Sequence, residues 1–278
     1  MSTQKALCVG INLFKNYPGA TLQGCVNDAN DMVALLKDKV GFAQADITLL
    51  TDAQATKAAI MQRLTQMVTD AKAGKLDAIV FSLSSHGTQL PDTNGDEPDG
   101  LDEAFCPHDL TQTGNQWDLN HVIVDDELNA LFVQLPSTTT LEVYLDTCHS
   151  GTGMKGGETD MWPVRFFLPD EIEQANATWL KSHPVSKALG DTTSKPKVEA
   201  QRVLWAGCRA DQTSADANFG GKPNGAFTYF YVKTVREATG AITRDQIIAK
   251  IQAVMKGQFT QIPQLETDAL NRAKQIAS

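Results

Sequence analysis

The chain has 278 residues, of which 42% are hydrophobic and 21% are charged, and its net charge is −9. This composition is that of a globular protein large enough for one large α/β domain or two small ones. The excess of acid argues against a nucleic-acid partner, because phosphate binding needs concentrated Lys and Arg. It is compatible with cationic substrates, although plain solubility explains it as well.

The five cysteines are odd in number, widely spread and without CxxC spacing. This pattern predicts a reduced, cytoplasmic chain rather than a disulfide scaffold or a zinc site. There is neither an apolar signal sequence at the start nor a run of 18 apolar residues, so we expect no membrane partner.

Apolar periodicity predicts alternating strands and helices through the first half of the chain. In chain order, the expected strands are 5–11, 46–50, 77–83 and 140–145, and the expected helices are 27–39, 56–73 and 125–134. Strands that alternate with helices predict a parallel sheet with helices on both faces. The active sites of such sheets lie beyond the carboxyl ends of the strands.

The stretch 151–200 differs from the rest of the chain. It is rich in Gly, Pro, Thr, Lys and Asp and holds one weak helix at 170–180, which predicts a long exposed connection. Regular structure returns with a strand at 202–208 and two helices, at 225–239 and 243–255, the second with Thr243 as its N-cap.

A cysteine and a histidine each follow a buried strand. Cys148 comes after the strand at 140–145 and His86 after the strand at 77–83, so the thiol and the imidazole can meet if these strands are parallel neighbours. A thiolate nucleophile needs such a base within hydrogen-bond reach. Gly87 would let its backbone N–H approach a substrate carbonyl. The alternative is a structural cysteine and an unrelated loop histidine.

Eight short motifs, taken in their order and spacing, resemble the metacaspase family of caspase-like cysteine peptidases. They are 22–29 (LQGCVNDA), 84–87 (SSHG), 96–103 (DEPDGLDE), 124–128 (VDDEL), 146–152 (DTCHSGT), 211–216 (DQTSAD), 225–228 (GAFT) and 261–265 (QIPQL). The resemblance is to bacterial-type members, metacaspases or orthocaspases, without an N-terminal prodomain. It implies an α/β fold, a caspase-like three-layer αβα sandwich around a mostly parallel six-stranded sheet.

The resemblance also implies how this single caspase-like domain is divided. Residues 1–153 form a large-subunit-like half with the catalytic dyad, 154–200 an exposed connection, and 201–278 a small-subunit-like half. The implied activity is hydrolysis of peptide or protein substrates after Arg or Lys, carried out by a monomer.

Each site residue takes a role from the same resemblance. Cys148 is the nucleophile, His86 is the general base and acid, and the backbone N–H groups of Gly87 and Cys148 form the oxyanion hole. The residues implied for the S1 pocket are Asp28, Ser84 and Asp146. A buried carboxylate pair needs a cation, and a guanidinium can supply bidentate hydrogen bonds. The alternatives are a helix N-cap for Asp28 and a turn residue for Asp146.

Many relatives cleave themselves between the two subunit-like halves, and this chain supplies basic residues there. They are Lys155, Arg165, Lys181, Lys187, Lys195 and Lys197. We expect self-cleavage after one of them, and the alternative is a segment that covers the site until it is displaced.

No cofactor is expected for the chemistry, and calcium is a candidate activator. The acids that match the family's calcium site are Asp102, Asp125 and Asp126, and a fourth position is Lys155, whose charge would repel the ion. Glu158 or Asp160 could replace it. The alternative is a solvated acidic hairpin.

Two other functions fit the same sequence: a catalytically silent caspase-like module that binds proteins, and a related cysteine peptide ligase. Both the cysteine and the histidine are present, which favours the peptidase.

Overall fold

The computed structural model describes residues 3–95, 97, 99–148, 162–183 and 201–277. A six-stranded sheet forms its centre, in the order β14-β10-β9-β3-β1-β2, and only β14 runs antiparallel to its neighbour. The strands are β1 (Gln4–Gly10), β2 (Ile47–Thr51), β3 (Ala78–Ser84), β9 (Thr140–Asp146), β10 (Gln201–Ala206) and β14 (Gln264–Glu266). The predicted mostly parallel six-stranded sheet is confirmed.

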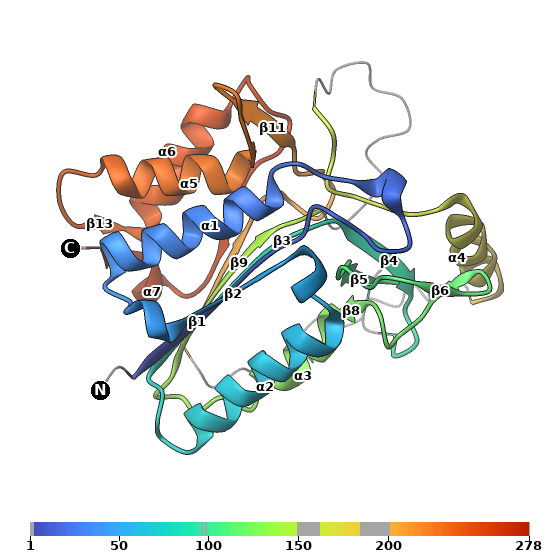
Figure 1. The fold of residues 1–278 in the computed structure, drawn as a ribbon, viewed down its shortest axis with the longest axis horizontal. Coiled ribbons are helices and arrows are strands. Elements are labelled where there is room, and N and C mark those ends of the chain that lie inside the picture. The colour runs from blue at the N-terminus through green and yellow to red at the C-terminus, as the bar shows by residue number, and fades with distance from the viewer. Residues whose placement is uncertain (1–2, 96, 98, 149–161, 184–200, 278) are drawn as a thin grey trace.

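Helices cover both faces of this sheet, which completes the predicted αβα sandwich (Figure 1). One face carries α1 (Cys25–Leu35), α5 (Ala226–Glu237) and α6 (Arg244–Met255), and the other carries α2 (Lys57–Lys72) and α3 (Asp125–Phe132). A short α7 (Ala269–Ala273) follows β14, and short helical turns lie at Pro18–Ala20, Leu36–Val40, Gln44–Asp46 and Asp52–Gln54. Among the described residues, we find no helix long and apolar enough to span a membrane.

The strands are apolar on both faces because both faces are covered. In β1, Leu7 and Val9 belong to the core under α2, whereas Ala6 and Cys8 belong to the core under α1 and α5. Successive side chains of a strand point to opposite faces, so a strand between two helix layers reads as a continuous apolar run. The parallel strands could therefore be predicted from the sequence.

The short strands were not predicted. β4 (Gly87–Pro91), β5 (Leu101–Phe105) and β8 (Ile123–Val124) form a small antiparallel sheet beyond the end of β3. Three two-stranded pairs join β6 (Gln112–Thr113) to β7 (Gln116–Trp117), β11 (Asp216–Phe219) to β12 (Lys222–Gly225), and β13 (Ile242–Thr243) to β15 (Gln275–Ala277). Such strands are too short to establish a period.

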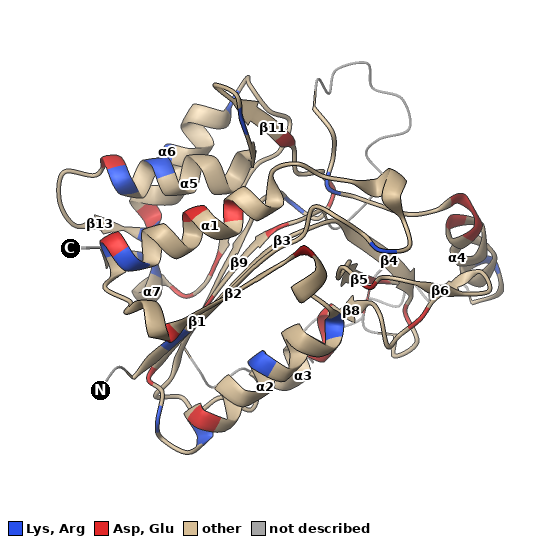
Figure 2. Ribbon diagram, viewed as in Figure 1, with Lys and Arg blue, Asp and Glu red and all other residues tan. Residues whose placement is uncertain are grey.

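The connection between the two halves is partly exposed and partly buried where the structure describes it. Within 162–183, Arg165 is completely buried, and α4 (Asp170–Ser182) packs Ile172 into the core. The helix predicted at 170–180 is therefore present, with acidic residues in its first turn (Figure 2), where the helix dipole favours negative charge. Composition does not report which single residues of such a stretch are buried.

Candidate active site

The loops after β3 and β9 meet at the carboxyl edge of the sheet. Ser84 pairs with Asp146 in the last register position of these neighbouring strands, and His86 and Cys148 each follow two residues later. The contact between the two loops requires glycine at position 87, because a Cβ on Gly87 would lie 1.6 Å from the Cys148 carbonyl oxygen. Only glycine allows the two backbones to approach this closely.

The Cys148 thiol is completely buried and is held by a loop from the second half of the chain. The backbone N–H of Ser214 donates to Sγ at 2.7 Å, and Sγ lies 3.5 Å from the Ser214 carbonyl oxygen. An N–H donor at this distance stabilises negative charge on sulfur, which is what a nucleophilic thiolate requires.

The His86 ring is oriented by one backbone carbonyl. Nε2 lies 2.8 Å from the Ala20 carbonyl oxygen, and because a carbonyl only accepts, Nε2 carries the proton. Nδ1 is buried without a hydrogen-bond partner among the described residues, so it holds a free lone pair. Burial lowers the pKa of His86 to about 4, although the Ala20 carbonyl acts in the opposite direction. The ring is therefore neutral at pH 7 and able to accept a proton.

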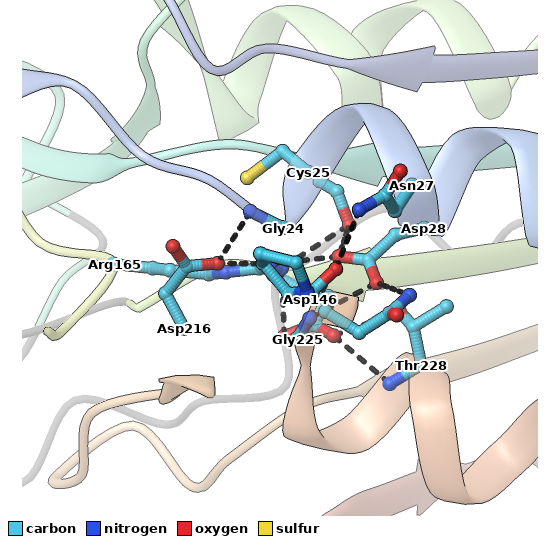
Figure 3. A network of polar contacts seen from close by, with 12 residues as sticks. Gly24, Cys25, Asn27, Asp28, Asp146, Arg165, Asp216, Gly225 and Thr228 are labelled. Carbon is cyan, nitrogen blue, oxygen red and sulfur yellow. Dashed lines mark hydrogen bonds and ion pairs between the residues drawn. The ribbon is translucent and has the colours of Figure 1, made fainter. Parts of the chain in front are cut away.

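A guanidinium lies among buried carboxylates (Figure 3). Arg165 Nη2 donates to Asp28 Oδ2 at 2.7 Å and to Asp216 Oδ1 at 2.9 Å. Nη1 donates to Ser84 Oγ at 3.2 Å and to the Asp146 carbonyl at 3.1 Å, and it lies 3.3 Å from Asp146 Oδ1. The three predicted pocket residues thus come together around one cation, joined by Asp216.

The two predicted carboxylates are fixed by groups other than the cation. Asp28 Oδ1 accepts hydrogen bonds from Asn224 Nδ2 at 2.9 Å and from the Gly225 N–H at 3.0 Å. Asp146 Oδ2 accepts from the Thr228 N–H at 2.9 Å and from its hydroxyl at 2.7 Å. Both carboxylates are therefore held by uncharged donors as well as by Arg165.

The charge balance of the pocket favours a cation. Asp28, Asp146 and Asp216 surround one Arg165, and all four side chains are buried. Burial raises the pKa of Asp28 to about 6, and the Arg165 charge only partly counteracts it. Without a cation, these carboxylates would repel one another in a medium that screens charge poorly.

The backbone of Arg165 lies against the two loops as well. Its carbonyl oxygen accepts from the Gly87 N–H at 2.8 Å and from the Cys148 N–H at 3.2 Å. These are the two N–H groups that the sequence predicted for an oxyanion hole. One residue of the chain therefore places its side chain in the acidic pocket and its carbonyl between both donors.

The residues on either side of Arg165 continue this arrangement in an extended conformation. Before it, Val164 forms an antiparallel bridge with Ala215, and the Asp216 N–H donates to the Pro163 carbonyl at 2.8 Å. After it, Phe166 forms a parallel bridge with Gly87. The stretch is held like an added strand, which is a common mode of peptide recognition.

Sequence reasoning assigned no role to several residues around the pocket, among them Ser214, Asp216 and Gly225. Ser214 and Asp216 lie in the 211–216 motif, and Gly225 begins the 225–228 motif. The motifs therefore contained these residues, but the sequence analysis assigned them no function. A Cβ on Gly225 would lie 2.2 Å from Asp146 Oδ2 and 2.4 Å from Arg165 Nη1, so the guanidinium requires glycine there.

The calcium candidates come from neighbouring elements of the small sheet. Asp102 is on β5, which pairs with β8, and Asp125 and Asp126 begin α3 directly after β8. Asp126 Oδ2 accepts a hydrogen bond from Asn94 Nδ2 at 2.5 Å. Within the described ranges, no three acids, histidines or cysteines form a cluster that could hold a metal. The other residues named for calcium, Lys155, Glu158 and Asp160, lie outside the described residues, and calcium binding stays a prediction.

Comparison with known proteins assigns the family. The model described as "Metacaspase, peptidase C14 domain" matches residues 4–156. Metacaspase-1A of Aspergillus niger is 30% identical over 292 residues, which cover 94% of this chain and 69% of the relative. Metacaspase-1 of Botryotinia fuckeliana is 29% identical, with coverage of 94% and 67%.

Solved structures share the fold. A Geobacter sulfurreducens protein is 28% identical and superimposes with a TM-score of 0.70, covering 98% of this chain and 97% of its own. Caspase-1 of Spodoptera frugiperda, at 12% identity, covers 96% and 86% with a TM-score of 0.61, which speaks for the fold alone. With the C14 match over residues 4–156 and relatives at 30% identity, this chain belongs to the metacaspase family and is a cysteine peptidase with a caspase-like fold.

Proposed function

We propose that the protein is an endopeptidase that cleaves after Arg or Lys through a Cys148–His86 dyad and that processes itself after Arg165. The observation that carries this proposal is the position of Arg165. Its guanidinium lies among three carboxylates while its carbonyl accepts from the Gly87 and Cys148 N–H groups. A substrate residue before a scissile bond needs both contacts at once.

The chemistry follows from these groups. His86 Nδ1 takes the thiol proton of Cys148, and the sulfur attacks the carbonyl carbon while the oxyanion receives hydrogen bonds from Gly87 and Cys148. When the C–N bond breaks, the leaving amine takes the proton from His86 and an acyl-thioester remains. His86 then accepts a proton from water, whose oxygen displaces the sulfur and releases a carboxylate that ends in Arg or Lys.

Self-processing is assigned to the Arg165–Phe166 bond. Of the six basic candidates, Lys181 lies near the end of α4, and four others lie outside the described residues. Arg165 is the residue whose contacts match those of a bound substrate. Until the bond is cut, the same contacts keep other substrates out of the pocket, so Arg165 acts both as substrate and as inhibitor in its own chain.

Carboxylate removal tests the specificity. We expect Asp28→Asn and Asp146→Asn each to lower kcat/KM on Arg peptides by an amount equivalent to about 2–5 kcal/mol, since each leaves a substrate cation without one partner. Arg peptides should be cleaved faster than Lys peptides, because a guanidinium reaches several acceptors in one plane. The control is Asp38→Asn, which removes an exposed ion pair with Arg236. Efficient cleavage after Asp by the wild type would contradict the proposal.

The pH dependence of cleavage distinguishes the pocket from the base. Activity on Arg peptides should fall as pH decreases through the pKa of Asp28, which is about 6 with Arg165 beside it and higher in the free pocket, because the protonated carboxyl loses its attraction for the substrate. His86, whose pKa is about 4, stays unprotonated in this range. A profile of kcat/KM from pH 4 to 9 should therefore lose this step in Asp28→Asn. The same step in that variant would assign it to another group.

The cellular setting and an activator belong to the same proposal. All five cysteines are free thiols, which supports work in the reducing cytoplasm. The described residues of the site all come from one chain, which supports an active monomer. Calcium is retained as an activator at Asp102, Asp125 and Asp126, although acids in the first turn of α3 also suit its helix dipole.

A further inference from the structure

Phe167, two positions beyond Arg165, lies in a recess formed by Tyr17, Trp117 and the His86 ring. The Phe167 N–H donates to the Gly87 carbonyl at 2.9 Å. Its ring centroid lies 5.1 Å from that of Tyr17 and 6.2 Å from that of Trp117. Edge-to-face and tilted ring pairs at these distances are favourable beyond the burial of their area.

The walls of this recess are fixed by contacts that do not involve Phe167. Trp117 is 5% exposed and its Nε1–H donates to Thr88 Oγ1 at 2.9 Å. The Tyr17 hydroxyl donates to Gln112 Oε1 at 2.9 Å, and the Tyr17 and Trp117 rings meet edge to face at 5.8 Å. The recess is therefore preorganised, which lowers the cost of binding an aromatic group.

The recess borders the catalytic base. The Phe167 ring lies 5.8 Å from the His86 ring, and Phe14 lies 5.2 Å from His86. An aromatic side chain in the recess thus covers the imidazole and excludes water beside it. Phe167 occupies this place because its backbone is aligned by Gly87 and because α4 anchors the chain that follows.

That anchor is independent of the bond after Arg165. Ile172 on α4 is buried in the core, and Asn176 Nδ2 donates to the Gln89 carbonyl at 3.2 Å. After a cut at 165, Phe167 would remain tethered next to the recess. It is therefore an internal competitor for any substrate side chain that binds there.

We propose that the recess of Tyr17, Trp117 and the His86 ring is a subsite for an aromatic residue at the second position after the cut. The inference rests on the proposed function, because it assigns the leaving side of that same cleft. The preferred substrates are then proteins with Arg followed, two residues later, by Phe, Tyr or Trp.

Self-cleavage supplies the first test. Phe167→Ala should slow the appearance of fragments that end at Arg165 by roughly 10- to 100-fold, the scale for one lost pocket side chain, whereas Phe167→Tyr should keep most of the rate. The control is Phe219→Ala, which removes a ring stacked on Tyr229 at 3.7 Å in another part of the chain. Thermal unfolding of each variant in the Cys148→Ala background checks that the fold is retained.

The second test uses peptides and an enzyme whose recess is free. Phe167→Ala protein, incubated until its processing is complete, receives two quenched peptides that differ only in Phe or Ser at the second position after Arg. The Phe peptide should have a kcat/KM roughly tenfold or more above that of the Ser peptide. Adding Tyr17→Ala should bring the ratio close to one, while adding Tyr229→Ala should leave it unchanged.

A fluorogenic Arg amide without a second leaving-side residue separates the two proposals. If neither the amide nor the peptides are cleaved, the proposed function fails. If the amide and both peptides are cleaved and the two peptides at equal rates, the function stands and the aromatic subsite is overturned. A high ratio that survives Tyr17→Ala also overturns it, because the preference would then arise elsewhere.

Discussion

Replacing Cys148 by alanine is expected to lower kcat/KM on Arg peptides by roughly 10⁴-fold or more and to stop cleavage after Arg165. The variant keeps both N–H groups that face the Arg165 carbonyl, but it has no atom that can form the acyl intermediate. The loss should appear almost entirely in kcat, because the carboxylate pocket still binds the substrate. Peptide assays and intact-mass measurement of the purified protein check both outcomes.

The control for the missing thiol is Cys8→Ala. Cys8 is equally buried, but it lies on β1 in the core under α1. Its loss should reduce stability without stopping the reaction. Near-normal turnover by Cys148→Ala would disprove the dyad, and fragments that still end at Arg165 would show that another peptidase makes the cut.

Replacing Arg165 by alanine in the unprocessed Cys148→Ala protein is expected to lower the free energy of unfolding by about 3–5 kcal/mol at pH 8. The variant leaves Asp28, Asp146 and Asp216 buried around an empty space, without the cation that all three contact. Denaturant titration of the two proteins measures the difference. The control is Arg209→Ala, whose ion pair with Asp211 is exposed, and it should leave the free energy of unfolding unchanged.

The destabilisation by Arg165→Ala should shrink as pH decreases. The folded-state pKa of Asp28 is already about 6 with Arg165 beside it, above the value of about 3.9 for an unfolded chain, and it rises further when the cation is removed. The folded state then binds protons that the unfolded state does not, so stability falls as pH rises through the folded pKa. The difference should therefore be smaller at pH 5 than at pH 8. Equal stability of the two proteins at pH 8 would contradict the role of Arg165 as counter-ion.

The sequence was sufficient where a pattern repeats or where a short motif stands at the end of a strand. β1, β3 and β9 were predicted because a strand buried on both faces is apolar at every position. The prediction of Cys148 and His86 depends on two of these strands, β9 and β3, because the carboxyl ends of neighbouring parallel strands lie at the same edge of a sheet. The S1 candidates Asp28 and Asp146 came from motif resemblance, and the structure brings both onto one guanidinium.

Only the tertiary structure decided which residue meets that pocket and what lies beyond it. Arg165 is one of six basic residues in a stretch whose composition predicts exposure, and nothing local marks it as buried. Its burial depends on carboxylates that are 137, 19 and 51 residues away in the chain, and pairings over such distances leave no periodic trace in a single sequence. The recess around Phe167 was hidden for the same reason, because its walls come from segments that lie far apart in the chain.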